Sequence, residues 1–118
     1  MRCTLVWFAL LMTGCDEPPA PTLSEVPVQF IGVWDASLAD CGADSGPLRV
    51  SVAPTEIIFP DSNIAVTGVA PDGEHAVRVS GHAAGPGTEW EGSVRLELAD
   101  GVLSVVNGLP VVPRVKCP

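Results

Sequence analysis

Apolar and polar residues alternate one by one in several short segments of this chain, and this pattern limits the possible folds more than any other feature. In the clearest segment, Val94, Leu96 and Leu98 alternate with Arg95 and Glu97. Successive side chains of a strand point to opposite faces, so the pattern is typical of antiparallel strands with one face against a core. It predicts strands over residues 30–35, 48–52, 55–59, 64–69, 77–80, 94–99, 102–106 and 111–115.

Residues that favour tight turns separate these predicted strands. The chain contains 12 glycines and 12 prolines, and Asp100-Gly101 between two alternating segments is the clearest hairpin signal. Other predicted turns are Gly46-Pro47, Pro60-Asp61-Ser62-Asn63, Pro71-Asp72-Gly73, Gly85-Pro86-Gly87 and Asn107-Gly108. We therefore expect an all-β fold, a small antiparallel barrel or sandwich of seven or eight strands, as one domain over residues 28–118.

The first residues of the chain have the composition of an export signal. Arg2 supplies a positive charge, and residues 3–12 are apolar apart from Thr4. A transmembrane helix needs about 20 apolar residues. The run is therefore too short to span a bilayer, and its length fits the hydrophobic region of a signal peptide.

Two small residues, Thr13 and Gly14, come directly before Cys15, and Met12 precedes them. This segment resembles the lipobox of bacterial lipoprotein precursors, in which an aliphatic residue and two small residues precede the lipidated cysteine. The resemblance implies that residues 1–14 are removed. It also implies that the thiolate of Cys15 takes up a diacylglyceryl group, with a further acyl chain such as palmitate on the new N-terminus. An ordinary secretory signal, with Cys15 present by coincidence, is the alternative.

Residues 15–27 connect this cysteine to the predicted domain. They are rich in proline and acidic residues. Proline fixes φ and lacks a backbone N–H group, so we expect an extended tether here. Asp16, directly after Cys15, resembles the inner-membrane retention signal of enterobacterial lipoproteins. The resemblance implies attachment to the periplasmic face of the inner membrane, and the outer membrane is the alternative location.

The chain after the signal is strongly acidic. All 14 acidic residues follow Cys15, whereas one of the six basic residues, Arg2, precedes it. Five basic residues against 14 acidic ones leave the exported chain with a net charge of −9. Such a surface repels phosphate backbones and anionic lipid head groups. We therefore expect no nucleic-acid partner, and membrane attachment through the lipid on Cys15. The acidity is typical of a soluble surface, with a cationic protein partner as the alternative.

The cysteines also indicate export. Cys3 would leave with the signal and Cys15 would carry lipid, so Cys41 and Cys117 remain. An even remainder in an exported chain favours one disulfide, which would close a loop of about 76 residues. Two free thiols or a metal-binding pair are the alternatives, although no histidine lies at typical ligand spacing from either cysteine.

A short aromatic motif stands in the first predicted strand. Gly32 and Trp34, followed by two later cysteines, are similar to the same features of small lipocalin-like barrels. They are also similar to those of the barrel-shaped protease and lysozyme inhibitors of the bacterial envelope. In such barrels the tryptophan fills the closed end. Trp34 and Trp90 are the candidates to line a ligand site, and core packing is the alternative for both.

The sequence offers few residues for catalysis or metal binding. His75 and His82 stand near predicted turns and would converge with Glu74 or Glu89 if they shared a hairpin, but a metal site needs further nitrogen or sulfur ligands. Glu89 and Glu91 share one strand face and are only loosely similar to a glycosidase pair. No serine stands in a Gly-x-Ser-x-Gly motif. We therefore expect no catalytic residues, no enzyme activity, no metal and no cofactor.

These features together favour a lipid-anchored binding or inhibitor module of the bacterial cell envelope. Such a module would take up a small apolar ligand or block the cleft of a protein partner. A structural or accessory subunit of an envelope complex, tethered through Cys15, is the alternative.

Overall fold

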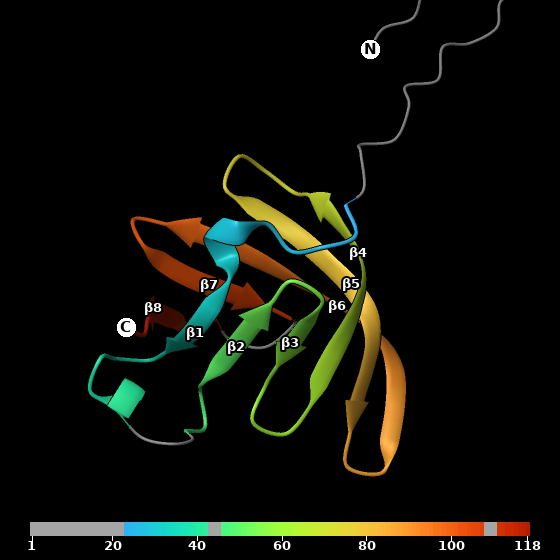
Figure 1. Ribbon diagram of the computed structural model, residues 1–118, viewed down its shortest axis with the longest axis horizontal. Helices are drawn as coiled ribbons and strands as arrows, with labels where there is room; N and C mark the ends of the chain where they lie inside the picture. Colours follow the sequence, from blue (N-terminus) through green and yellow to red (C-terminus); the bar gives the residue numbers. More distant parts are fainter. Residues whose placement is uncertain (1–22, 43–45, 108–110) are drawn as a thin grey trace, which may run out of the picture.

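The alternating segments pair with their neighbours in the sequence and form a closed antiparallel barrel (Figure 1). The computed structural model describes residues 23–42, 46–107 and 111–118. The strands are β1 (Gly32–Asp35), β2 (Val50–Ala53), β3 (Glu56–Ile58), β4 (Asn63–Pro71), β5 (Ala76–Gly85), β6 (Thr88–Ala99), β7 (Val102–Val106) and β8 (Pro113–Lys116). They follow one another around the barrel in chain order, and β8 pairs with β1 to close it. The all-β prediction is confirmed, and the chain adopts the barrel rather than the sandwich.

The hairpin predicted at Asp100-Gly101 joins β6 to β7. Both residues have positive φ angles, 54° and 78°. Positive φ at both central positions matches the twist of the two flanking strands, which is why such pairs favour tight hairpins. The hairpin sets the register, with Leu96 opposite Val105 and Leu98 opposite Leu103. The prediction of this turn is confirmed.

Strands β5 and β6 are longer than the alternating segments that predict them. Their pairing continues beyond residues 77–80 and 94–99, as far as Gly85 opposite Thr88. The added residues are mostly small or polar and show no apolar alternation. They enter the sheet because strand pairing uses backbone groups, which any residue except proline supplies fully.

Gly81 allows β4 and β5 to approach each other closely. A Cβ atom at this position would lie 2.0 Å from the carbonyl oxygen of Ala65. The register of the two strands shifts next to this contact, between Val66 and Gly68. Only glycine fits here without moving the backbone of β4.

One end of the barrel is closed by the segment that precedes β1. This segment contains the 3-10 turn η1 (Val28–Phe30). Phe30 is 1% exposed, and its carbonyl oxygen accepts a hydrogen bond of 3.0 Å from Nε1 of Trp34. The buried core runs from this end into the barrel; its other large members include Ile57, Leu96, Leu103, Val50, Val69 and Val79.

Contact between the N-terminal segment and the barrel begins before residue 28, where we placed the domain boundary. Leu23 exchanges two backbone hydrogen bonds with Val69, of 2.7 and 2.8 Å. Val26 is buried and donates its N–H group to the carbonyl oxygen of Pro54. Residues 23–27 therefore pack on the barrel, although the sequence places them in the tether. Cys15 and the remainder of the predicted tether lie outside the described residues.

The predicted disulfide between Cys41 and Cys117 is present. The two sulfur atoms are 2.02 Å apart, and the Cα atoms are 5.5 Å apart. Cys41 belongs to the 3-10 turn η2 (Asp40–Gly42) in the loop between β1 and β2. Cys117 follows β8 and donates its N–H group to Val33 of β1. The bridge therefore holds the β1–β2 loop to the seam at which the barrel closes.

Asp35 differs from its sequence pattern. The alternation of β1 places it on the polar face, yet it is 1% exposed. Its carboxylate accepts hydrogen bonds from Nε of Arg49 and from the N–H group of Ala36. Arg49 also donates to the carbonyl oxygens of Asp40 and Cys41. The β1–β2 loop thus folds over an outward-facing carboxylate and buries it.

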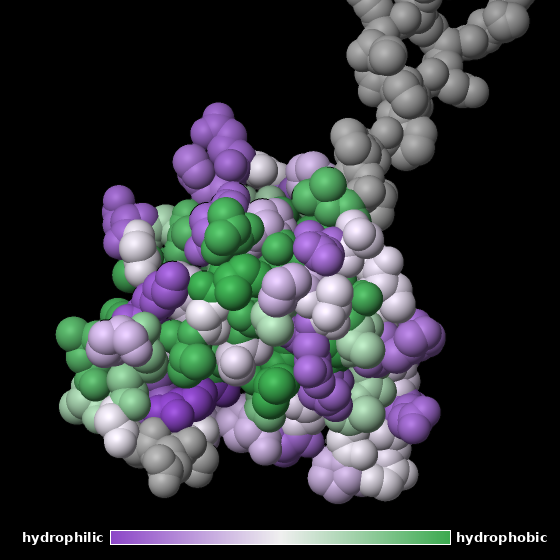
Figure 2. Space-filling view, viewed as in Figure 1, coloured by the Kyte–Doolittle hydropathy of each residue, from purple (hydrophilic) through white to green (hydrophobic). Residues whose placement is uncertain are grey.

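The outer surface is mixed in character. Figure 2 shows apolar side chains lying among polar ones over the face that carries β1, β2 and β3. Val28 and Leu38 are the most exposed large apolar residues of the described chain, at 81% and 66%. In the described ranges, no helix combines the length and the apolar character that crossing a membrane requires.

Candidate ligand site at the open end of the barrel

The end of the barrel opposite η1 is open. Since the strands run up and down in order, the β1–β2, β3–β4, β5–β6 and β7–β8 loops all lie at this end. They surround a cavity of about 590 Å³. Ligand sites in proteins commonly have volumes of about 300–1,000 Å³, so the cavity can hold a small molecule. The loop residues that line it include Pro47, Leu48, Phe59, Pro60, Asp61, Ser62, Pro86, Asn107 and Val112.

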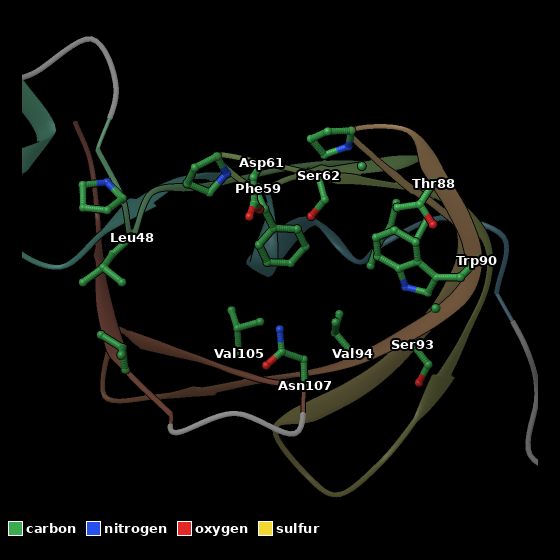
Figure 3. A pocket seen from close by; sticks show the side chains of 18 of the residues that line it. Leu48, Phe59, Asp61, Ser62, Thr88, Trp90, Ser93, Val94, Val105 and Asn107 are labelled. Atoms are coloured by element: carbon green, nitrogen blue, oxygen red, sulfur yellow. The ribbon is translucent and has the colours of Figure 1, made fainter.

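The wall of this cavity is largely apolar. Inward-facing residues of four strands, Ile64, Ala83, Val94 and Val105, lie along it. Figure 3 shows Phe59 projecting into the space, with Val94 and Val105 pointing toward it from the opposite side. The next inward-facing residues of β6 and β7 toward η1 are Leu96 and Leu103, which are fully buried. The cavity therefore opens to solvent at the mouth and ends against the packed core.

Trp90 forms one side of the cavity. It lies on β6 opposite Ala83 and is 45% exposed. Its ring packs beside Gly85, where a Cβ atom would lie in ordinary van der Waals contact, 3.4 Å from Cη2 of the indole. Within the described residues the indole N–H group has no hydrogen-bond partner, and the ring points into the cavity (Figure 3). Trp90 thus occupies the position that its candidacy as a ligand-lining residue requires.

Trp34 does not line this cavity, and its candidacy is corrected. It is 2% exposed and belongs to the core cluster, where its indole N–H group is bonded to Phe30. The two tryptophans therefore lie in different parts of the barrel: Trp34 packs in the core beside η1, and Trp90 lies at the open end. Core packing, the alternative considered for both tryptophans, applies to Trp34 alone.

Within the described part of the chain, two charged residues line the cavity, and neither was predicted from the sequence as a site residue. Asp61 is exposed at the mouth, in the β3–β4 loop. Arg114 is half-buried on β8, opposite Leu103. Burial lowers the pKa of Arg114 below its ordinary value, and the negative charge of Asp35 opposes this shift. The side chain still carries its positive charge at neutral pH, because arginine does not lose its proton in proteins.

The candidate residues for metal binding and catalysis, His75, His82, Glu89 and Glu91, are not among the residues that line the cavity. His75 precedes β5 and His82 lies within it, so seven residues of extended chain, roughly 23 Å, separate them. His82 pairs with Glu91 of β6 at 2.6 Å on the outer surface, and His75 lies 3.7 Å from Glu74. The two histidines do not share the hairpin contact that convergence requires. In the ranges that the structure describes, no three acidic, histidine or cysteine side chains gather as metal ligands would.

Fold and cavity together define an up-and-down β-barrel that is closed at one end and carries a ligand-sized, mainly apolar cavity at the other. No protein-family model, no curated protein and no solved structure matches this chain.

Proposed function

We propose that this protein is a binding module that holds a small apolar ligand in the open end of its barrel, and that lipid on Cys15 anchors it in a bacterial cell envelope. The cavity of about 590 Å³, walled by Phe59, Trp90, Val94 and Val105, is the observation that carries the first part. Burying an alkyl group against such a wall is favourable by about 0.8 kcal/mol per methylene. The anchor is inferred from the resemblance of residues 11–15 to a lipobox.

The N-terminal segment contacts the end of the barrel opposite the cavity, and this position supports one orientation of the barrel relative to the membrane. Leu23 and Val26 contact the barrel at Val69 and Pro54, near the end that η1 closes. The cavity opens at the other end, between the loops that include Phe59 and Asn107. With lipid on Cys15, the closed end would face the membrane and the cavity would open toward the aqueous side. The module would then take its ligand from solution or from a protein rather than from the bilayer below it.

Filling the cavity tests the binding function. Ala83 is a small, buried residue of the cavity wall, and Ala65 is exposed on the outer face of β4. We expect Ala83→Phe to lower the affinity for 1-octanol by about tenfold or more, because a close-packed interior has no other space for the added ring. The matched control Ala65→Phe should bind like the wild type. The measurement is equilibrium dialysis of labelled octanol against the full chain in phosphatidylcholine nanodiscs, with empty nanodiscs as the blank. Equal binding by all three chains, or no binding by the wild type, would contradict the proposal.

Metabolic labelling tests the anchor. Bacteria that express the chain are grown with an alkyne-tagged fatty acid, and the purified protein is examined for the label. We expect the wild type and Cys3→Ala to be labelled, because Cys3 lies within the segment that cleavage would remove. Cys15→Ala should carry no label. Labelling of Cys15→Ala at the wild-type level would contradict the lipobox prediction.

The alternative role, an accessory subunit of an envelope complex, stays a prediction from the sequence. Crosslinking in intact cells followed by purification of the full chain tests it. Recovery of one partner in fixed proportion, together with loss of that partner's complex when the chain is deleted, is the expected result for this role.

A further inference from the structure

Arg114 points toward the interior of the barrel. It lies directly opposite Leu103 in the β7–β8 pair, and opposed residues of an antiparallel pair share a face. Leu103 is fully buried, so this face is the inner one. Arg114 is accordingly one of the residues that line the cavity. A charged side chain on the inner face of a barrel this small carries a desolvation cost that an exterior position would avoid.

The guanidinium group is held in place by the mouth of the barrel. Its Nε atom donates to the carbonyl oxygen of Leu48 at 2.6 Å, and its Nη1 atom donates to that of Val112 at 3.2 Å. Leu48 belongs to the β1–β2 loop and Val112 precedes β8, and both line the cavity. Two backbone acceptors from different segments fix the plane of the group, so little rotamer freedom remains to be lost when a ligand binds.

Part of the guanidinium remains available. The group has five N–H donors, and within the described residues only the two bonds to Leu48 and Val112 are made. Its Nη2 atom has no partner there, and no carboxylate of the described chain lies within 4.0 Å of it. Among the described residues, the acidic residue that lines the cavity is Asp61, which is exposed at the rim, where water screens its charge. The negative charge of Asp35 also acts on Arg114, but its carboxylate is bonded to Arg49 on the outside of the barrel. Arg114 is therefore the cationic residue of the described cavity lining, and its Nη2 atom has no carboxylate partner there.

We propose that the ligand of this barrel is an anionic amphiphile, whose carboxylate or phosphate head binds Arg114 and whose alkyl chain lies against Phe59, Ile64 and Val94. The proposal rests on the proposed function, since it names the chemical class that the same cavity takes up. Guanidinium groups bind carboxylates and phosphates through charge-assisted hydrogen bonds, which are shorter and stronger than neutral ones. The unpartnered indole N–H group of Trp90 is a second donor toward the same space. The cavity thus combines two donors with an apolar wall, as an acid with a hydrocarbon tail requires.

Head-group comparison at constant chain length tests the inference. Octanoate, octyl phosphate and 1-octanol are each dialysed against the full chain in phosphatidylcholine nanodiscs, with empty nanodiscs as the blank. We expect at least one of the two anions to bind about tenfold or more tightly than octanol, because a hydrogen bond to a charged group adds that much affinity. The anion that binds more tightly distinguishes a carboxylate ligand from a phosphate ligand, and either result supports the proposal.

Variants of Arg114 locate the effect. Arg114→Met keeps the length of the side chain without its charge, and should remove the preference for anions over octanol. Arg114→Lys keeps the charge and should retain part of the preference. Arg78→Met is the matched control, because Arg78 is half-exposed on the outer face of β5 and pairs with Asp72. Octanol binding reports whether each variant retains its cavity.

Three results would overturn the inference. If octanol binds as tightly as both anions, the inference of an anionic ligand is wrong, whereas the proposed function stays intact. An anion preference that survives in Arg114→Met would assign the head group to another residue. Failure of all three compounds to bind the wild-type chain would remove the proposed function and the inference together.

Discussion

The Nε atom of Arg49 lies 3.1 Å from Oδ2 of Asp35, and the carboxylate that it meets is almost completely buried on the outside of the barrel. Arg49 stands at the end of the β1–β2 loop, which also contains Cys41 of the disulfide and Leu48 of the cavity mouth. Leu48 in turn accepts the hydrogen bond from Arg114. The ion pair, the disulfide and the cavity cation are therefore connected through one loop.

Loss of the buried carboxylate should destabilise the barrel. Asp35→Ala removes the carboxylate that accepts hydrogen bonds from Nε of Arg49 and from the Ala36 N–H group, while the arginine stays largely buried. We expect the free energy of unfolding to fall by about 3 kcal/mol, as for other buried pairs that lose one partner. The measurement is urea-induced unfolding followed by circular dichroism. The control Glu91→Ala removes an exposed partner of His82 and should change stability by less than about 0.5 kcal/mol. Similar losses in the two variants would show that burial of Asp35 contributes nothing.

The disulfide should contribute more than any single side chain. It links residues 76 positions apart, and the chain-entropy model gives a loop of this length about 4–5 kcal/mol of stabilisation. We expect the double variant Cys41→Ser/Cys117→Ser to lose about this amount in denaturant unfolding. A reducing agent should lower the unfolding midpoint of the wild type and leave that of the double variant unchanged. A wild type that does not respond to reduction would argue against the bridge.

A single methyl group at Gly81 should disturb the pairing of β4 with β5. The added Cβ atom would lie 2.0 Å from the carbonyl oxygen of Ala65, a backbone atom that cannot turn away. We expect Gly81→Ala to cost about 3 kcal/mol, at the upper end of overpacking effects. Gly42→Ala is the control, because nothing lies within 4 Å of the position that its Cβ atom would take. Thermal unfolding of the two variants, compared with the wild type, is the measurement, and equal melting temperatures would refute the close approach.

The two tryptophans should respond differently to the same substitution. Trp34→Phe leaves the carbonyl oxygen of Phe30 without its buried donor, so we expect a loss of about 2 kcal/mol of stability. Trp90→Phe replaces a half-exposed indole, which has no hydrogen bond in the described chain, by a smaller ring. It should lower the free energy of unfolding by less than about 1 kcal/mol. Denaturant unfolding by circular dichroism measures both values. A larger loss for Trp90→Phe would contradict the assignment of Trp34 to the core.

Local patterns in the sequence determined the class of fold. The alternation around Arg95 predicts its strand because side chains of a strand point to opposite faces whatever the strand pairs with. Asp100-Gly101 predicts the β6–β7 turn because backbone preference at two residues is a local property. The Cys41–Cys117 bridge followed from counting, since an even remainder in an exported chain favours pairing.

The tertiary structure alone decided where the site lies and which residues form it. The inward direction of Arg114 depends on its register with Leu103, and the burial of Asp35 depends on a loop that folds over it. Both are contacts between segments that lie apart along the chain, and no local pattern encodes them. The extension of β5 and β6 through residues 81–92 has the same cause, because backbone pairing orders residues that show no alternation of their own. Closure of the barrel by β1 and β8 then leaves one end filled by Phe30 and Trp34 and the other open beside Trp90, which no single segment of the sequence could indicate.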